Sequence, residues 1–396
     1  MPTPTWQDFA DLAVKRLAAS GAEYGDIRIV HSSTQSIRGE DRRISSIRDL
    51  DDIGFGIRVL FHGGWGFAAS SILSLEEVPR VADLAVEIAK ASASIAIEKV
   101  VLAGEPVHHD RVVTPVRIDP FTVPLTQKTG LLLATMESLQ AQPGVVRSSA
   151  ELWARRDRKF FASTEGTRLE LDLLASSGEC TATALHDGRF ASRSFNTPQL
   201  RRGYELIEEA DFPGQASRVA GEAVEKVRAP AVEAGPYDLV LDPEHLSLTM
   251  HESCGHPSEL DRALGYEANY AGTSFLTTDT LGRFRYGSSH VNLVADNTEP
   301  ETLAATGYDD DGVACQKWDI VRDGLFVGYC TNREVAPKIG AARSRGSNRA
   351  DSWGTVPIVR IANIGLEPGQ ATLDELLADV QRGIYIEGHG SRSEEH

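Results

Sequence analysis

Polar and apolar residues alternate along two long stretches of the first half of the chain, residues 26–70 and 144–186. The segment from Thr167 to Leu173 places an apolar residue at every second position. Because successive side chains of a strand point to opposite faces, this period predicts strands with one buried face. The sequence His62-Gly63-Gly64 predicts a turn inside the first stretch.

Other segments of the first half have apolar residues at helical spacing. Thr5 with Asp8, and Ser74 with Glu77, resemble capping boxes at the starts of two of them. The predicted helices carry apolar stripes from Trp6 to Leu17 and from Val78 to Ile88, and cover about 124–139 and about 213–227.

Residues 229–236 have no periodicity and contain two prolines, so we interpret them as a linker between two domains. After the linker we expect a strand at Tyr237–Leu241 and then a helix capped by Asp242. Asp323-Gly324 indicates a hairpin turn. Further elements expected are a strand at Val356–Ile361 and a helix from Thr372, with Glu375 as its capping partner, to about Gln381.

The predicted fold class is therefore α+β. An N-terminal α/β domain covers residues 1–228, and a C-terminal, mainly antiparallel β domain covers residues 237–396, with the helix that contains His251 near its start. Two domains also fit the length of 396 residues.

Composition narrows the function classes. The formal net charge of −17 repels phosphate groups, so we expect neither direct nucleic-acid binding nor docking on an anionic membrane. The N-terminus lacks the apolar core of a signal peptide, and no apolar stretch approaches the roughly 20 residues of a membrane-spanning helix. The four cysteines form no CxxC pair and suggest reduced thiols. We expect a soluble, cytoplasmic protein.

One short segment combines residues that can do chemistry. His251 and Glu252 are adjacent, and His256 follows within the same six residues. Imidazole nitrogens are good zinc ligands, and a neighbouring carboxylate can take a proton from water at the metal.

The spacing requires a departure from α-helical geometry. Histidines five residues apart lie about 140° apart around a regular α-helix and cannot share one ion. Either a π-bulge brings His251 and His256 onto one face, or the helix ends at Gly255 and His256 folds back from a loop. Pro257 favours a helix end.

Residues that could bind a metal can also have purely structural roles. His251 and His256 can instead be hydrogen-bonding residues at a helix end, with Glu252 solvated, and the pattern alone fits this equally well. Asp309-Asp310-Asp311-Gly312 lacks the spaced ligands of a calcium loop, so we interpret it as an acidic turn.

The segment HESCGHPSELDRALGYEANYAGTSF resembles the metal-site segment of the TldD/PmbA metallopeptidase family, in its TldD-like branch with the HExxxH motif. The resemblance implies that His251 and His256 bind zinc and that Glu252 is the catalytic base. It also implies roles for Glu259 and Asp261 beside the ligands or on the substrate side of the site.

The resemblance extends over nearly the whole chain, through SIRGEDRRISSIRDLDDIGFGIRVLFHGGWGFAAS, SRGSNRA and PIVRIAN. It implies proteolysis of peptides or unfolded segments by dimers, either homomeric or with a related subunit, that enclose a sheltered active site. A non-catalytic peptide-binding or partner subunit of such a complex is the alternative.

The family's third zinc ligand is a cysteine in a glycine-rich segment near its C-terminus. This chain ends at His396 before such a segment, so we expect the C-terminal domain to be incomplete and the zinc to be held weakly. Cys180, Cys315 and Cys330 do not match that position. We expect Cys254, inside the motif, to be a packed small residue.

Overall fold

The computed structural model describes residues 4–388. The last eight residues, where the expectation about the C-terminal end falls, lie outside the described residues. Below, the N-terminal part means residues 4–228 and the C-terminal part means residues 237–388. The division into domains predicted above stays a prediction. Residues 229–236, the predicted linker, contain no helix or strand.

Four antiparallel strands of 17 to 19 residues form the centre of a seven-stranded sheet in the N-terminal part. They are β1 (Tyr24–Glu40), β2 (Arg43–Phe61), β5 (Val145–Ser163) and β6 (Arg168–His186). The order is β3-β2-β1-β5-β6-β4, with β7 paired to β6. The shorter strands are β3 (Gly64–Ser70), β4 (His109–Val113) and β7 (Arg189–Asn196).

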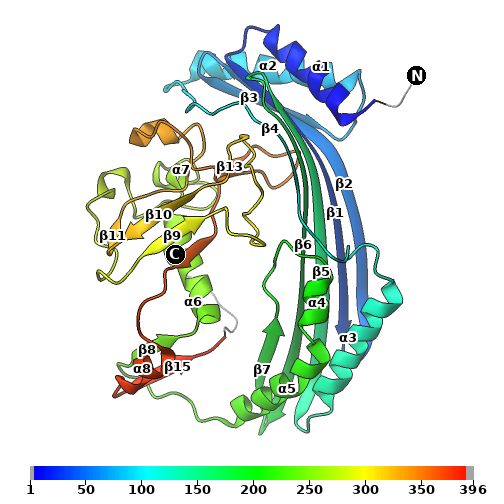
Figure 1. Ribbon diagram of the computed structural model, residues 1–396, viewed down its shortest axis with the longest axis vertical. Coiled ribbons are helices and arrows are strands. Elements are labelled where there is room, and N and C mark those ends of the chain that lie inside the picture. The colour runs from blue at the N-terminus through cyan, green and yellow to red at the C-terminus, as the bar shows by residue number, and fades with distance from the viewer. Residues whose placement is uncertain (1–3, 389–396) are drawn as a thin grey trace.

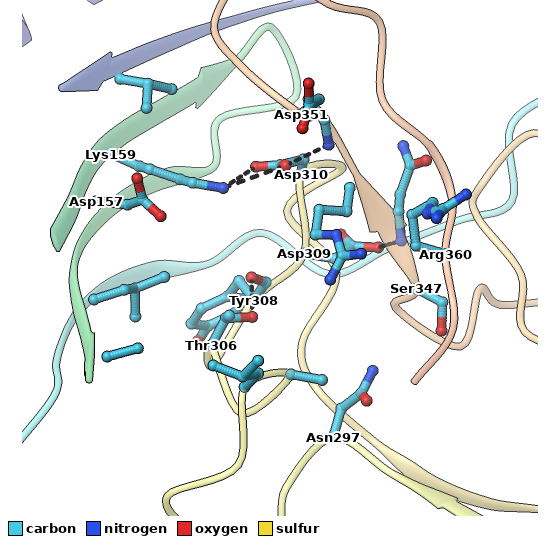
Figure 2. A pocket seen from close by; sticks show the side chains of 18 of the residues that line it. Asp157, Lys159, Asn297, Thr306, Tyr308, Asp309, Asp310, Ser347, Asp351 and Arg360 are labelled. Carbon is cyan, nitrogen blue, oxygen red and sulfur yellow. Dashed lines mark hydrogen bonds and ion pairs between the residues drawn. The ribbon is translucent and has the colours of Figure 1, made fainter. Parts of the chain in front are cut away.

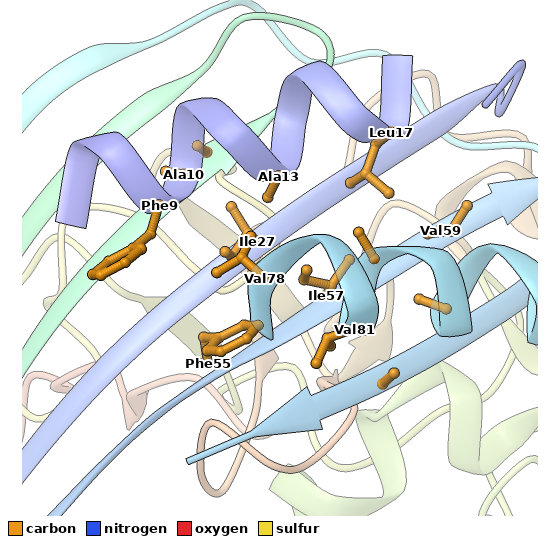
Figure 3. Packing of buried hydrophobic residues seen from close by; sticks show 14 of the residues in the cluster. Phe9, Ala10, Ala13, Leu17, Ile27, Phe55, Ile57, Val59, Val78 and Val81 are labelled. Carbon is orange, nitrogen blue, oxygen red and sulfur yellow. The ribbon is translucent and has the colours of Figure 1, made fainter. Parts of the chain in front are cut away.

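Strands of this length extend about 60 Å, which is longer than the helices that pack on them. One hydrophobic core cannot extend over the whole face of the sheet. Two separate cores therefore form, one at each end (Figure 1). At the first end, α1 (Trp6–Ala18) and α2 (Glu77–Ile95) pack on the sheet, and Phe9, Leu17 and Val81 meet Ile27 and Ile57 (Figure 3). At the other end the helices are α3 (Leu125–Gln140), α4 (Glu205–Glu209) and α5 (Phe212–Arg228).

The C-terminal part lies on the concave side of the long strands (Figure 1). Its third core surrounds a four-stranded sheet of order β11-β10-β9-β14. The strands are β8 (Asp238–Leu241), β9 (Leu293–Asp296), β10 (Lys317–Arg322), β11 (Leu325–Phe326), β12 (Asn348–Arg349), β13 (Ile358–Val359), β14 (Ile364–Leu366) and β15 (Gly383–Ile386). The helices of four or more residues with α geometry are α6 (Pro243–Met250), α7 (Leu260–Ala263) and α8 (Leu373–Ala378).

Ion pairs join the two parts, and one of them, between Arg58 and Asp311, is buried. Arg58 of β2 contacts Asp26 of β1 at 2.5 Å and Asp311 of the C-terminal part at 2.8 Å. Arg333 of the C-terminal part contacts Glu165 at 2.7 Å. Removing one partner of a buried pair leaves an uncompensated charge, which is strongly destabilising. These contacts therefore define how the C-terminal part sits on the sheet.

The predicted α+β fold is confirmed, and so are several local signals. Thr5 and Asp8 form a capping box at α1, and Thr372 and Glu375 form one at α8. The predicted turn at Asp323-Gly324 has positive φ at both residues and joins β10 to β11. Such φ values match the twist of a two-residue hairpin.

Other local predictions need correction. The second helix begins at Glu77, and although Ser74 Oγ accepts from Glu77 N at 3.1 Å, the Glu77 carboxylate instead accepts from Ser70 Oγ. Only Ile358–Val359 of the strand predicted at 356–361 is a strand. Pro357 has no N–H to contribute to a ladder, which limits the pairing there.

The predicted turn at His62-Gly63 is present, but a second hairpin turn at Asp41-Arg42 was not anticipated. Asp41 and Arg42 both have positive φ without the glycine or asparagine that usually marks such a turn. Among residues 4–388, no helix is long and apolar enough to cross a membrane.

Candidate metal centre

A π-helical turn places both histidines of the motif on one face. Helix α6 is capped by the Asp242 side chain and ends at Met250, and residues His251–Gly255 continue it with π geometry. The His256 backbone N–H donates to the His251 carbonyl, the i→i+5 bond of a π turn. The first of the two alternatives, a π-bulge, is therefore confirmed.

The three side chains of the motif converge. One ligand atom from each of His251, Glu252 and His256 lies within 4.8 Å of the others. The imidazole centroids are 4.7 Å apart, with an angle of 80° between the ring planes. Across residues 4–388, no further His, Cys, Asp or Glu side chain joins this group. The third ligand expected from the family resemblance, a cysteine, stays a prediction.

Contacts from distant segments hold the π turn. The Tyr286 hydroxyl donates to the Ser253 carbonyl at 2.5 Å, and its oxygen lies 2.9 Å from Cys254 Sγ. Cys254 is buried, as expected of a packed residue. A Cβ on Gly255 would lie 3.0 Å from the Ile361 side chain, so the close approach of that side chain favours glycine.

Glu259 orients one of the two imidazoles. Its Oε2 lies 3.1 Å from His256 Nδ1, and the Glu259 side chain is fully buried. Arg262 Nη2 contacts the same carboxylate oxygen at 2.9 Å. Arg262 Nη2 also lies 3.2 Å from Nδ1, so both side chains hold the ring at this nitrogen. The charged carboxylate is the nearer of the two and favours a proton on Nδ1, which leaves the Nε2 lone pair for a metal. Glu259 is thus found next to the candidate ligands.

Asp261 has a different place. Its carboxylate accepts the backbone N–H of Arg262 at 2.8 Å and that of Val359 in β13 at 2.9 Å. Burial, together with repulsion from Glu267, raises the pKa of Asp261 to about 7. Asp261 therefore ties the metal-site segment to the β12–β13 ribbon and is not part of the three-residue group.

The surroundings of His251 favour its neutral form. Desolvation, followed by repulsion from His256, lowers the pKa of His251. The neutral form is the one that ligates a metal. His251 is exposed, while Glu252 and His256 are partly exposed, so a ligand can approach the group from solvent.

The residues present fit a divalent transition metal. Two imidazoles beside one carboxylate are ligands suited to zinc and its neighbours, whereas calcium and magnesium prefer all-oxygen sites. Glu259 Oε1 is also buried without a hydrogen-bond partner in the part of the chain that the structure describes. The Glu259 carboxylate is paired with Arg262 through Oε2, so Oε1 is an unused acceptor beside the candidate metal centre.

Comparison with known families agrees with this geometry. The PmbA/TldA metallopeptidase C-terminal domain matches residues 234–393, and domain 1 of the same family matches residues 25–89. The chain belongs to the PmbA/TldD metallopeptidase family. The C-terminal match contains the whole π turn and the β12–β13 ribbon.

Several relatives in the PmbA/TldD family are named metalloproteases. One from Methanocaldococcus jannaschii is 27% identical over 92% of this chain and 78% of its own length. Another from Synechocystis is 28% identical over 93% of this chain and 76% of its own length. A protein from Saccharolobus solfataricus named a zinc metalloprotease TldD homolog is 23% identical, over 94% and 79%. A metalloprotease-type function is therefore supported.

Solved structures share the fold. A candidate modulator of a DNA gyrase from Thermotoga maritima superposes with a TM-score of 0.78 at 19% identity, over 97% of this chain and 82% of that chain. TldE from Thermococcus kodakarensis superposes with a TM-score of 0.69 at 16% identity, over 97% and 83%. At these identities the likeness concerns the fold alone.

Sequence patterns missed the residues that support the metal centre. Tyr286 lies 33 positions after Ser253, and no local motif links them. Arg262 was inside the segment quoted for the resemblance, but its contact with Glu259 depends on the turn geometry. The sequence signal that could have identified the pair is the spacing of Glu259 and Arg262, two opposite charges three residues apart that follow the candidate ligand His256.

Proposed function

We propose that this chain is a zinc-dependent peptidase that hydrolyses peptides or unfolded segments. His251 and His256 are the proposed zinc ligands, and Glu252 is the proposed catalytic base. The observation that carries the proposal is the π turn, which brings these three side chains within 4.8 Å of one another although the histidines are five residues apart. The zinc metalloprotease name of the Saccharolobus relative supports the choice of metal.

Each residue has a defined task. A bound ion supplies Lewis acidity, which polarises the scissile carbonyl and makes water acidic enough to react near neutral pH. Glu252 accepts a proton from the attacking water and delivers it to the leaving amine. Glu259 orients the His256 imidazole through its contact with Nδ1.

We further propose that the active form is a dimer, homomeric or with a related subunit, acting in the cytoplasm. Tyr266, Tyr270 and Phe275 are exposed in the segment that follows the metal-site turn, and exposed aromatic side chains are enriched at protein–protein interfaces. All four cysteines are free, which suits a reducing compartment.

Light scattering of the purified chain, alone and with a candidate partner, measures the assembly. Because the net charge is −17, we propose no direct binding to nucleic acid or to anionic membranes.

The deciding experiment compares Glu252→Gln with the wild type. We expect zinc per chain to stay near the wild-type value, while hydrolysis of an unstructured quenched peptide falls roughly a hundredfold or more. Glu367→Gln, on an exposed carboxylate, is the matched control and should behave as the wild type. His251→Ala should lose zinc and activity together.

Two outcomes would contradict the proposal. A Glu252→Gln variant that keeps most of the activity would remove Glu252 from the mechanism. Wild-type protein that binds peptide and zinc but hydrolyses no peptide would favour the alternative, a non-catalytic peptide-binding or partner subunit.

A further inference from the structure

A cavity of about 330 Å³ lies between the long sheet and the β12–β13 ribbon of the C-terminal part (Figure 2). Lys159 of β5 lines it from the sheet, and Arg349 and Arg360 line it from the ribbon. Ile361 also lines the cavity, and its side chain is the one that approaches Gly255 of the π turn. The cavity therefore adjoins the candidate metal centre.

The cavity is basic although the protein is acidic. Six basic and four acidic residues line it, whereas the whole chain carries a net charge of −17. Three of the four acidic side chains already have partners, and the fourth, that of Asp351, is exposed. Asp157 pairs with Arg155 at 2.9 Å, and Asp310 pairs with Lys159 at 3.0 Å (Figure 2). Asp309 accepts hydrogen bonds from backbone N–H groups, including that of Asn348 at 3.0 Å.

Two arginines in the cavity have no such partner. Within residues 4–388, neither Arg349 nor Arg360 donates a side-chain hydrogen bond or forms an ion pair. In the antiparallel ribbon Arg349 pairs with Ile358, and Arg360 N donates to Ser347 O, so the two arginines project from the same face. Arg349 is exposed and Arg360 is partly exposed, so both guanidinium groups are accessible to a ligand.

The arginines of the cavity repel one another. The surrounding protein partly desolvates the guanidinium of Arg349 although the residue is exposed, and this effect, followed by the charge of Arg360, lowers the pKa of Arg349 against the opposing charge of Asp310. Burial lowers the pKa of Arg201 to about 10, with Arg349 and Arg155 adding to the effect and Asp157 opposing it. An anion placed between these groups would relieve the repulsion and gain hydrogen bonds that the protein itself does not supply.

We propose that Arg349 and Arg360 form a subsite that binds a carboxylate of the peptide substrate. The planar guanidinium fork matches a carboxylate in two parallel hydrogen bonds, which gives orientation as well as affinity. This subsite rests on the proposed peptidase function, because its place beside the metal centre would hold a substrate carboxylate near the scissile bond. The carboxylate is either the peptide's C-terminus or an Asp or Glu side chain.

The test uses quenched peptides of one neutral sequence and the whole 396-residue chain, loaded with zinc. One peptide has a free C-terminus and a second is amidated. A third set consists of amidated peptides with a single Glu, placed in turn on either side of the cleavage point. A fourth set has Gln at the same positions. We expect kcat/KM to be roughly ten- to hundredfold higher for a carboxylate-bearing peptide than for its neutral counterpart. The set that shows the preference identifies the source of the carboxylate.

Variants connect the preference to the two arginines. Arg349→Gln and Arg360→Gln should each reduce the preference to within about threefold while the neutral peptides are still hydrolysed, and Arg360→Lys should be intermediate because it keeps charge without the fork. Arg283→Gln, on an exposed arginine outside the cavity, should keep the full preference. A preference that survives in both glutamine variants, or that is absent from the wild type, would overturn the subsite.

A second measurement separates failure of the subsite from failure of the peptidase. Fluorescence anisotropy with chelator-treated protein gives the Kd of each labelled peptide without hydrolysis. If no peptide is cleaved, the peptidase proposal fails, and the anisotropy result still decides the subsite. Equal Kd values for charged and neutral peptides would then count against the subsite. A lower Kd for the charged peptides that depends on Arg349 and Arg360 would support the subsite.

Discussion

His256 Nδ1 lies 3.1 Å from Oε2 of Glu259, whose side chain has no exposed surface. The contact joins a partly exposed imidazole to a buried charge that is otherwise balanced by Arg262. It restrains the orientation of the His256 ring beside His251 and Glu252. Glu259 is therefore a positioning residue for the candidate metal centre.

Replacing Glu259 with Gln should weaken metal binding and also lower the stability of the protein, because Arg262 then loses a charged partner at 2.9 Å and keeps Glu267, at 3.7 Å. The amide has the same shape but cannot stabilise the Nδ1–H tautomer as a carboxylate does, so we expect zinc affinity to fall roughly 10- to 100-fold. Competition with a chromophoric chelator gives the affinity, and circular dichroism checks the fold. Glu367→Gln is the control, and an unchanged affinity in Glu259→Gln would mean that the contact does not orient the ligand.

Gly255→Ala should destabilise the protein by about 1–3 kcal/mol, because the added Cβ would lie 3.0 Å from Ile361. The free energy of unfolding in urea measures the cost. The double variant with Ile361→Ala should recover part of it, since removing the outer atoms of that side chain makes room. Additive effects of the two substitutions would show that Gly255 and Ile361 are not in contact.

Asp310 should make stability depend on pH in acid. Burial raises the pKa of its carboxyl, but Lys159 and Arg28 outweigh burial and hold the pKa at about 2, below the usual 3.8. When folding lowers the pKa of a carboxyl, the charged group stabilises the folded protein. This stabilisation is fully present at pH values above the pKa of the unfolded chain, and it is lost as the pH falls through the pKa of the folded protein. The expected loss is about 2 kcal/mol between about pH 5 and pH 2.

Urea unfolding at several pH values tests this contribution. Asp310→Asn should be less stable near neutral pH, because Lys159 and Arg28 lose their charged partner, and should show a shallower decline in acid. Asp351→Asn removes an exposed carboxyl on the same cavity and should leave the decline nearly unchanged. Equal slopes for Asp310→Asn and the wild type would place the acid sensitivity elsewhere.

Local patterns were sufficient for most of the N-terminal part. Alternation predicted the regions of the long strands, and Thr5 and Asp242 marked helix starts that the structure confirms. The spacing of His251 and His256 also required non-α geometry in the turn between them, which is present. These predictions succeed because strand period, helix capping and turn dihedrals depend on residues a few positions apart.

Tertiary structure decided how the site is built. Of the two backbone alternatives at His251–Gly255, the π turn occurs where Tyr286 holds the Ser253 carbonyl and Ile361 packs on Gly255. The basic cavity likewise exists only because the β12–β13 ribbon lies against the long sheet. These contacts join segments that are tens to hundreds of residues apart, and their energies depend on packing and on shared burial of charge. No periodicity within one segment reports them, so the sequence by itself determined the candidate chemistry, whereas the fold determined its geometry and its neighbours.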